Sequence, residues 1–188
     1  MKAYYEARAH EYDDWWHWHV DEHPGEFAAL THVVESLAPV RTLDVACGTG
    51  FLTRHLRGEV VGIDQSAAVL EIAEQQAPDA EFLQAEGLEL PYEDDSFDRV
   101  FTSHFYGHLD PDERRTFLAE ARRIAPELVV VDSALRPDRP ATLMQERVLK
   151  DGSRWAVLKR YFSGESLRKE LGGGDVLHEG EYFVVVRA

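Results

Sequence analysis

The stretch Leu43-Asp44-Val45-Ala46-Cys47-Gly48-Thr49-Gly50 decides the fold, together with Val60-Val61-Gly62-Ile63-Asp64. An apolar strand runs into a loop that contains glycines, and a second apolar strand ends in a carboxylate twenty residues after Asp44. This order is typical of a βαβ unit that holds an adenosine-containing ligand at the carboxyl ends of its strands. The pattern therefore predicts both the fold class and the edge of the sheet where a ligand binds.

The remaining apolar runs extend this unit into a larger sheet. Strands are predicted over 41–46, 60–64, 81–84, 97–103 and 128–132, and a closing hairpin over 175–177 and 182–186 with a tight turn at Glu179-Gly180. Helices are predicted over 50–56, after Ser66 and after Asp110, where Asp110-Pro111-Asp112-Glu113 has the order of a helix start. The segment 136–171 reads as mostly helical or irregular. Together these elements predict a Rossmann-like, doubly wound α/β fold with a mostly parallel seven-stranded sheet and an antiparallel edge hairpin.

The chain is expected to form one domain over residues 1–188. Its length of 188 residues and its hydrophobic content of 44% are those of one globular core. Within it we expect a helical lid segment at 1–38, rich in Tyr and Trp, and a cofactor-binding core at 39–135. The segment 136–188 is expected to lie on the acceptor side and to end in the closing hairpin.

Charge and composition exclude several classes of partner. The net charge of -15 would repel a nucleic-acid backbone, and no Lys/Arg-rich stripe offsets it. The sequence contains no secretory signal and no apolar run of the ~20 residues that a membrane span needs. Its single cysteine, Cys47, fits a reducing compartment. We therefore expect a cytoplasmic protein that acts on a small molecule, without nucleic-acid or membrane partners.

The first loop also indicates which adenosine cofactor binds. A dinucleotide site usually reads G-x-G-x-x-G, but here Thr53 stands where the third glycine would be. Asp44, at the end of the first strand, suits a cationic amino-acid group better than a diphosphate. Both observations favour S-adenosylmethionine over NAD. A carboxylate in the position of Asp64 can accept hydrogen bonds from both ribose hydroxyls.

The chain resembles the class I S-adenosylmethionine-dependent methyltransferases. Residues 43–50 look like the first motif of that family, and Val61-Gly62-Ile63-Asp64-Gln65-Ser66 resembles its second. The runs 84–92 and 96–100 are similar to its third and fourth motifs. The subgroup that it resembles most is that of small-molecule methyltransferases of the ubiquinone/menaquinone-biosynthesis type. The resemblance is clear over about residues 1–135 and loose beyond.

The resemblance implies roles for individual residues. Tyr12 or Trp16 in the lid would close over the cofactor and exclude water. The resemblance also implies that Ala46, Cys47 and Gly48 border the methionine portion of the cofactor and that Asp64 holds its ribose. Its adenine would be contacted by Gln65, Glu86, Gly87 and Leu88. Ser103 and His104 would face its sulfonium side. Ala46 replaces a more usual glycine, which is tolerable where its backbone angles are ordinary.

In such enzymes the segment after the fifth strand often shapes the acceptor pocket. The segment from Gly152 to Gly164, which contains Trp155, Lys159 and Tyr161, is therefore a candidate for lining that pocket. The alternative is that its aromatic side chains pack in the core.

His104 and His108 are the candidate catalytic residues. Methyl transfer from a sulfonium mainly requires that the acceptor be placed in line, and a base is needed only where the acceptor loses a proton. Both histidines follow the fourth strand and could be that base, although either could instead serve only to hold the loop. No metal is expected, because the histidines at 17, 19 and 23 match no tight zinc pattern.

These inferences lead to one reading and leave two alternatives open. The sequence predicts a methyltransferase that moves a methyl group to a small-molecule acceptor. The short chain favours a small acceptor, or an acceptor site that a second copy in a homodimer completes. A non-catalytic S-adenosylmethionine-binding protein remains an alternative, as does, with less support, an NAD-dependent oxidoreductase.

Overall fold

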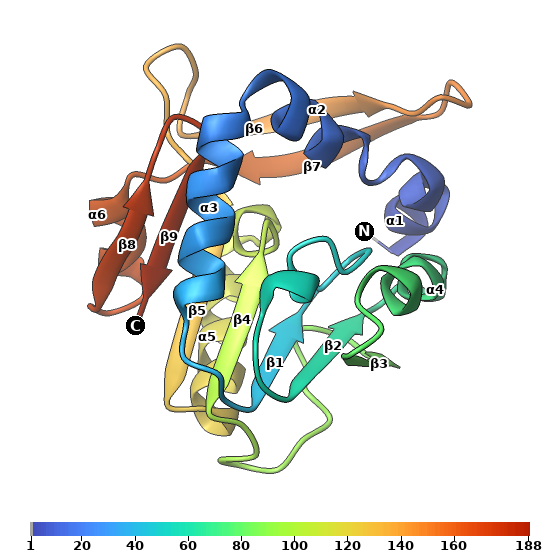
Figure 1. Ribbon diagram of the computed structural model, residues 1–188. Helices are drawn as coiled ribbons and strands as arrows, with labels where there is room; N and C mark the ends of the chain where they lie inside the picture. Colours follow the sequence, from blue (N-terminus) through green and yellow to red (C-terminus); the bar gives the residue numbers. More distant parts are fainter. Residues whose placement is uncertain (1) are drawn as a thin grey trace.

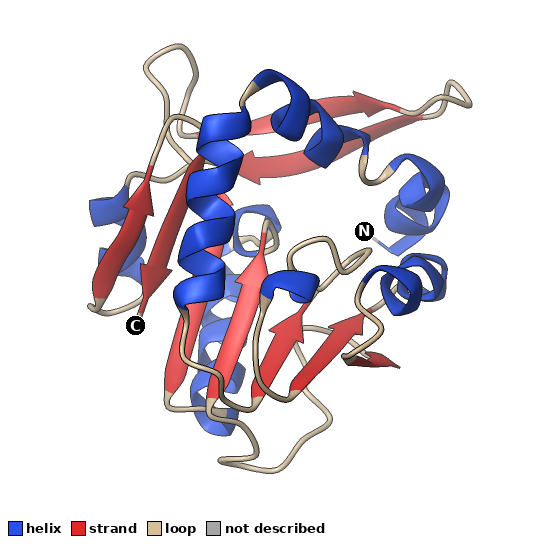
Figure 2. Cartoon of the chain, in the orientation of Figure 1, coloured by secondary structure: helices blue, strands red, loops and turns tan. Residues whose placement is uncertain are grey.

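The computed structural model describes residues 2–188 and alternates helices and strands along most of the chain (Figures 1 and 2). The helices are α1 (Lys2–Arg8), α2 (Asp14–Glu22), α3 (Pro24–Ser36), α4 (Ala67–Gln76), α5 (Pro111–Ile124) and α6 (Gly164–Glu170), with short 3₁₀ turns at η1 (Ala9–Glu11), η2 (Thr53–His55) and η3 (Tyr106–His108). The strands are β1 (Thr42–Val45), β2 (Val60–Asp64), β3 (Glu81–Gln84), β4 (Arg99–Ser103), β5 (Glu127–Ser133), β6 (Thr142–Val148), β7 (Arg154–Arg160), β8 (Asp175–Glu179) and β9 (Phe183–Arg187).

Seven of the strands form one twisted sheet in the order β3-β2-β1-β4-β5-β9-β8. The pairs from β3 to β5 are parallel, whereas β9 runs antiparallel to both β5 and β8. The prediction of a mostly parallel seven-stranded sheet with an antiparallel edge hairpin is therefore confirmed. Because parallel strands end at the same edge, Asp64 and Ser103 close β2 and β4 on either side of the loop that follows β1.

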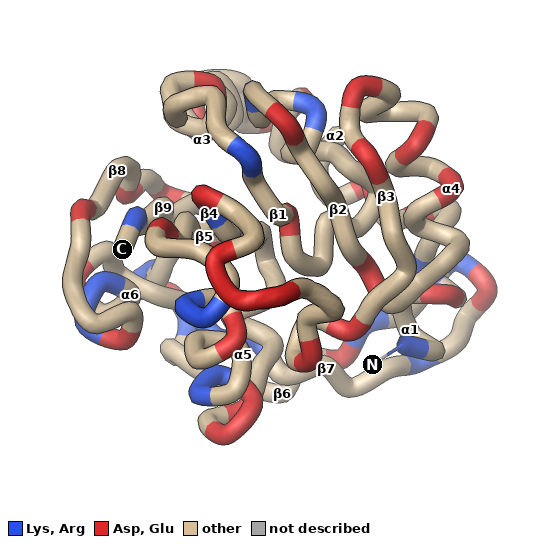
Figure 3. Tube along the Cα trace, turned by 90° about the horizontal axis from the view of Figure 1, so that it is seen from below, with Lys and Arg blue, Asp and Glu red and all other residues tan. Residues whose placement is uncertain are grey.

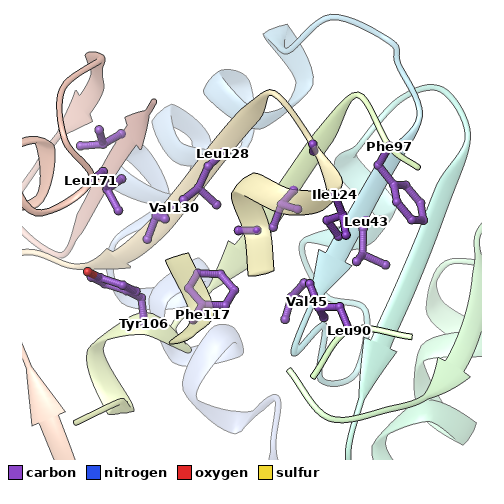
Figure 4. Close-up of a cluster of buried hydrophobic side chains, with 14 of the residues drawn as sticks. Leu43, Val45, Leu90, Phe97, Tyr106, Phe117, Ile124, Leu128, Val130 and Leu171 are labelled. Carbon is purple, nitrogen blue, oxygen red and sulfur yellow. The ribbon is translucent and has the colours of Figure 1, made fainter. Parts of the chain in front are cut away.

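Helices pack on both faces of the sheet. In Figure 1, α3 crosses one face in front of β4 and β5, and α5 lies behind it. Alternate residues of a strand point to opposite faces, so Val130 joins the cluster under α5 while Val129 and Val131 join the cluster under α3. Figure 4 shows the first cluster, where Phe117 and Ile124 of α5 lie over the sheet. Burial on both faces explains why β5 is an unbroken apolar run.

Local sequence signals at two helix starts were correct. The Asp110 carboxylate accepts hydrogen bonds from the backbone N–H groups of Asp112 and Glu113, at 2.8 and 2.9 Å, and Glu113 reaches back to the N–H of Asp110 at 2.8 Å. This is the reciprocal capping box expected from the sequence. Ser66 likewise caps α4 by accepting from Val69 N at 3.4 Å.

The helix predicted over 50–56 is wrong, because that stretch holds only turns and the 3₁₀ turn η2. The backbone dihedral φ is +55° at Gly48 and +74° at Gly50, in the left-handed region, and a chain that turns this way does not begin an α-helix. A Cβ at Gly50 would lie 3.2 Å from the Cα of Ala73 in α4. The loop is therefore a compact turn held against α4.

The prediction that 136–171 is mostly helical or irregular missed two strands. Two seven-residue strands, β6 and β7, pair there as an antiparallel two-stranded sheet, here called the ribbon, and only α6 is helical. Figure 1 shows the ribbon crossing above the carboxyl ends of β1 and β4, beside α1 and α2. Half-buried and exposed residues alternate along β6, but both sets include polar side chains. The period of two was therefore not visible as an alternation of apolar and polar residues.

Charged residues are spread over the molecule. Acidic positions occur on many elements and loops in Figure 3, which matches the net charge of -15. No helix among residues 2–188 is long and apolar enough to cross a membrane.

Candidate functional site

A cavity of about 390 Å³ lies at the carboxyl ends of β1 and β4, between the sheet, the N-terminal helices and the ribbon. It is at the edge where the sequence predicted a ligand. Eight of the residues predicted to contact the cofactor or to act in catalysis line it: Tyr12, Trp16, Asp44, Ala46, Cys47, Ser103, His104 and His108. They come from separate parts of the chain that the parallel sheet brings together.

The loop after β1 forms part of the cavity wall, and Tyr12 covers it. A Cβ added at Gly48 would lie 2.7 Å from the Tyr12 hydroxyl oxygen, so only glycine allows this approach. Ala46 has a φ of +57°, which is in the left-handed region. The condition for tolerating alanine here, ordinary backbone angles, is therefore not met, and alanine carries strain at a position where glycine would carry none.

Asp44 contributes a buried carboxylate with a free oxygen. The residue is 2% exposed, and its Oδ2 accepts a hydrogen bond from Thr53 Oγ1 at 2.7 Å. Its Oδ1 has no partner among the described residues. Burial raises the pKa of Asp44 to about 7, with a further increase from the charge of Asp64, against the Thr53 hydrogen bond. A buried carboxylate with an unused oxygen is suited to bind a cationic group.

Asp64 ties the ends of β1 and β2 together. Its Oδ2 accepts from Gly48 N at 3.1 Å, and its Oδ1 accepts from Ser66 N at 2.9 Å. Burial raises its pKa to about 6, although these backbone N–H groups favour the charged form. Each carboxylate oxygen has a second lone pair, so the contacts leave capacity for ligand hydroxyls.

Four predicted adenine contacts lie outside the cavity, around the ends of β2 and β3. The Gln65 carbonyl oxygen accepts from Gln84 Nε2 at 2.9 Å, and Glu86 is exposed. Gly87 lies under Phe105, since a Cβ there would be 2.9 Å from the ring. Leu88 packs against the first core cluster. The structure therefore places these four residues after β2 and β3, and none of them lines the cavity.

His104 projects into the cavity from a strained position at the end of β4. Its φ is +54°, and its Nδ1 lies 3.3 Å from Ser133 Oγ and 3.7 Å from Asp132 Oδ1. Its Nε2 has no partner among the described residues. Burial lowers the pKa of His104 to about 4, although the neighbouring Asp132 carboxylate favours the charged form, so the imidazole is neutral near pH 7. Non-glycine residues with positive φ cluster at functional sites.

His108 is held more firmly than His104. Its Nδ1 lies 2.6 Å from the carbonyl oxygen of Leu158 in β7, so Nδ1 carries the proton and donates it. Burial lowers the pKa of His108 to about 3, with a further decrease from the nearby Lys159 charge. This bond attaches η3 to the ribbon, which favours the holding role for His108.

Sequence reasoning missed most of the positively charged lining of the cavity. The cationic side chains that line it are Arg8, Arg136, Arg139, Arg147 and Lys159. Arg136, Arg139 and Arg147 lie in the segment 136–188, which was expected on the acceptor side, but none of them was singled out. Only Lys159 lay in the candidate acceptor-pocket segment 152–164. In that segment Lys159 and Tyr161 do line the cavity, whereas Trp155 packs 5.8 Å from Tyr4, measured between ring centroids. No periodic signal links arginines that come from a helix, a loop and a strand.

Comparison with known proteins agrees with this geometry. Residues 43–127 match the family model of a methyltransferase domain. This match covers less than half of the chain, and it shows that residues 43–127 are similar to methyltransferase domains. The matched part runs from β1 to the start of β5, so the N-terminal helices and the ribbon lie outside it.

Individual relatives are similar over different lengths. The chain is 34% identical over 100 residues to demethylmenaquinone methyltransferase of Thermotoga maritima, covering 50% of this chain and 43% of that protein. It thus spans about two fifths to a half of the curated relatives that it matches. The DhpI–SAM–HEP complex is similar over 98% of this chain and 94% of that one, with 26% identity and a TM-score of 0.78. The DhpI–SAH complex gives 27% identity and a TM-score of 0.75, covering 98% and 92%.

Proposed function

We propose that this chain is a methyltransferase that transfers the methyl group of S-adenosylmethionine to a small-molecule acceptor. The observation that carries the proposal is the unpartnered Oδ1 of Asp44, buried beside the left-handed loop of Ala46 and Gly48. An unpaired buried carboxylate oxygen costs stability unless a ligand satisfies it. The cofactor has a cationic amino-acid end that would do so. The similarity to a SAM-bound DhpI structure over nearly the whole chain supports the same conclusion.

The residues around the loop fit the cofactor. Asp44 would hold its ammonium group, and Asp64 would hold the ribose hydroxyls with its remaining lone pairs. Tyr12, which already lies over Gly48, would cover the loop and exclude water. The bound cofactor supplies an activated methyl group, so the protein need only place the acceptor in line with it.

His104 is the side chain best placed to act on an acceptor. It is neutral near pH 7, its Nδ1 faces Ser133 and Asp132, and its Nε2 is free to accept a proton. We propose that His104 accepts a proton from acceptors that lose one, and that it orients the others. His108 we assign to holding η3 against β7.

The experiment is a calorimetric titration of the protein with S-adenosylmethionine, S-adenosylhomocysteine and NAD in parallel. We expect the two sulfur compounds to bind and NAD not to bind. Asp44→Asn and Asp64→Ala should weaken binding, whereas Asp79→Asn, an exposed carboxylate on the loop after α4, should not. Binding of NAD in place of the sulfur compounds would overturn the proposal. Binding without methyl transfer to any acceptor in a broad screen would identify a non-catalytic cofactor-binding protein instead.

Where the protein acts and how it assembles are also proposals. Cys47 is a free thiol, which supports a reducing cytoplasmic location. The net charge of -15 argues against nucleic acid as the acceptor. A homodimer stays a prediction that sedimentation of the purified chain would test.

A further inference from the structure

The acceptor side of the cavity is strongly cationic, although the chain as a whole is acidic. Of 20 Lys and Arg residues in a chain of net charge -15, five line this one cavity. The carboxylates that line it are those of Asp44 and Glu181. Because acidic positions are spread over the rest of the molecule (Figure 3), this concentration of positive charge does not follow from composition.

The inner face of the ribbon supplies part of this charge. In β6 the half-buried residues are Leu143, Gln145 and Arg147, and the exposed residues alternate with them. Leu143 pairs with Lys159 across the ribbon, so Lys159 lies on the same face as Arg147. This face therefore presents an arginine, a lysine and an amide to the cavity, where an apolar acceptor would favour apolar side chains.

Some of these cations are neutralised by the protein itself. Lys159 Nζ lies 3.0 Å from Asp132 Oδ1, and Arg136 Nη2 lies 2.7 Å from Asp138 Oδ2. Arg139 shares the same carboxylate of Asp138 at 3.4 Å. Arg147 has no carboxylate within 4.0 Å among residues 2–188, so its charge is uncompensated by an ion pair.

Buried donors without partners point to a missing ligand. The Nε atoms of Arg139 and Arg147 are buried and unbonded among the described residues, as is the side-chain oxygen of Gln145. An unsatisfied buried donor on a charged group is costly, and proteins normally satisfy it. A guanidinium matches the paired oxygens of a carboxylate or a phosphate-type group. Tyr161, whose hydroxyl lies 3.4 Å from Arg139 Nη1, lines the cavity beside them.

We propose that the acceptor is a small molecule with an anionic oxyacid group, a carboxylate or a phosphate-type oxyanion, which Arg139 and Arg147 bind. This inference rests on the proposed methyltransferase function and names the class of its acceptor. The cavity of about 390 Å³ also includes the loop residues Ala46 and Cys47, so the acceptor shares it with the cofactor's reactive end and is small. Arg8 is set apart, because its guanidinium lies 4.7 Å from the Tyr12 ring, on the cofactor side.

The test measures anion binding directly. Inorganic phosphate and acetate are titrated separately at constant ionic strength, with glycerol as a neutral control, and tryptophan fluorescence is followed because Trp15, Trp16 and Trp18 line the cavity. We expect saturable binding of at least one anion. Arg147→Gln and Arg139→Gln should each weaken it roughly tenfold or more. The matched control is Arg154→Gln, which removes the same charge from the exposed, outer face of the ribbon and should leave binding unchanged.

A parallel titration with S-adenosylhomocysteine separates this inference from the function on which it rests. Its affinity should be unchanged in Arg147→Gln and Arg139→Gln. Loss of S-adenosylhomocysteine affinity in these variants with anion binding intact would mean that the arginines hold the cofactor's carboxylate, and would overturn the inference. Equal anion responses in all three variants, or no saturable anion binding, would also overturn it. If the protein bound anions but no S-adenosylhomocysteine, the proposed function would be overturned, and so would the proposal that the anion is the methyl acceptor. Arg139 and Arg147 would then still form an anion-binding site.

Discussion

Lys159 Nζ lies 3.0 Å from Asp132 Oδ1, and both side chains are buried. Lys159 belongs to the ribbon and Asp132 to the main sheet, so this ion pair joins the two sheets beneath the cavity. The other oxygen of Asp132 accepts from Gly107 N at 2.7 Å, and a Cβ at Gly107 would lie 2.8 Å from Oδ1. Burial would raise the pKa of Asp132, but Lys159 and His104 hold it well below its usual value.

Breaking this pair from one side should be strongly destabilising. Lys159→Met leaves the Asp132 charge buried without its partner, and we expect the free energy of unfolding to fall by about 3–5 kcal/mol. The double variant Lys159→Met/Asp132→Asn should lose less than the sum of the single variants. Lys150→Met, which breaks the exposed pair with Asp14, is the control and should change little. Urea unfolding measures all four, and additive losses would show that the pair is not coupled.

Ala46 offers a stabilising substitution. At a φ of +57° alanine is strained and glycine is not, so Ala46→Gly removes strain from the folded state. Glycine also gives the unfolded chain more conformational entropy, which offsets part of this gain. The free energy of unfolding should therefore rise by about 0.5–1 kcal/mol. The control is Ala28→Gly at an exposed position inside α3, which should lower stability by about 1 kcal/mol. Equal losses in both variants, measured by thermal and urea unfolding, would contradict a left-handed Ala46.

Cofactor affinity should depend on pH through Asp44. Its pKa is raised to about 7 by burial, so near pH 6 most of the free protein carries a protonated Asp44 that cannot pair with a cation. We expect S-adenosylhomocysteine to bind more tightly at pH 8 than at pH 6, with proton release on binding near pH 7. Calorimetry in buffers of different ionisation enthalpy measures that release. Asp44→Asn should abolish it, and a pH dependence that persists in this variant would assign it to another group.

Acid sensitivity should come partly from His104. Burial lowers its folded-state pKa from 6.5 to about 4, so the unfolded chain binds the proton more readily. Its contribution to stability is present above pH 6.5 and is lost as the pH falls toward 4. His104→Gln should therefore lose less stability between pH 7.5 and about pH 5 than the wild type. His10→Gln, at an exposed histidine, is the control, and identical acid profiles for the two variants would refute the assignment.

Much of the fold was accessible from local sequence patterns. The five parallel strands, the capping box at Asp110 and the closing hairpin were predicted because each depends on neighbouring residues: apolar runs, an Asp-Pro start and a tight turn. The helix over 50–56 was wrong because left-handed Gly48 and Gly50 turn the chain. The ribbon was missed because its inner face carries Gln145, Arg147 and Lys159, so hydrophobic periodicity was absent.

The sequence by itself determined the class of the site. A strand that ends at Asp44, a glycine loop and a second strand that ends at Asp64 are fixed by spacing along the chain, and the parallel sheet places their ends together. Only the tertiary structure decided the chemistry on the acceptor side. His104 lies far from Arg139 and Arg147 in sequence, and no spacing among the three predicts that they line one cavity. They meet because the ribbon folds over the sheet, where the Lys159–Asp132 ion pair and the hydrogen bond from His108 to Leu158 attach it.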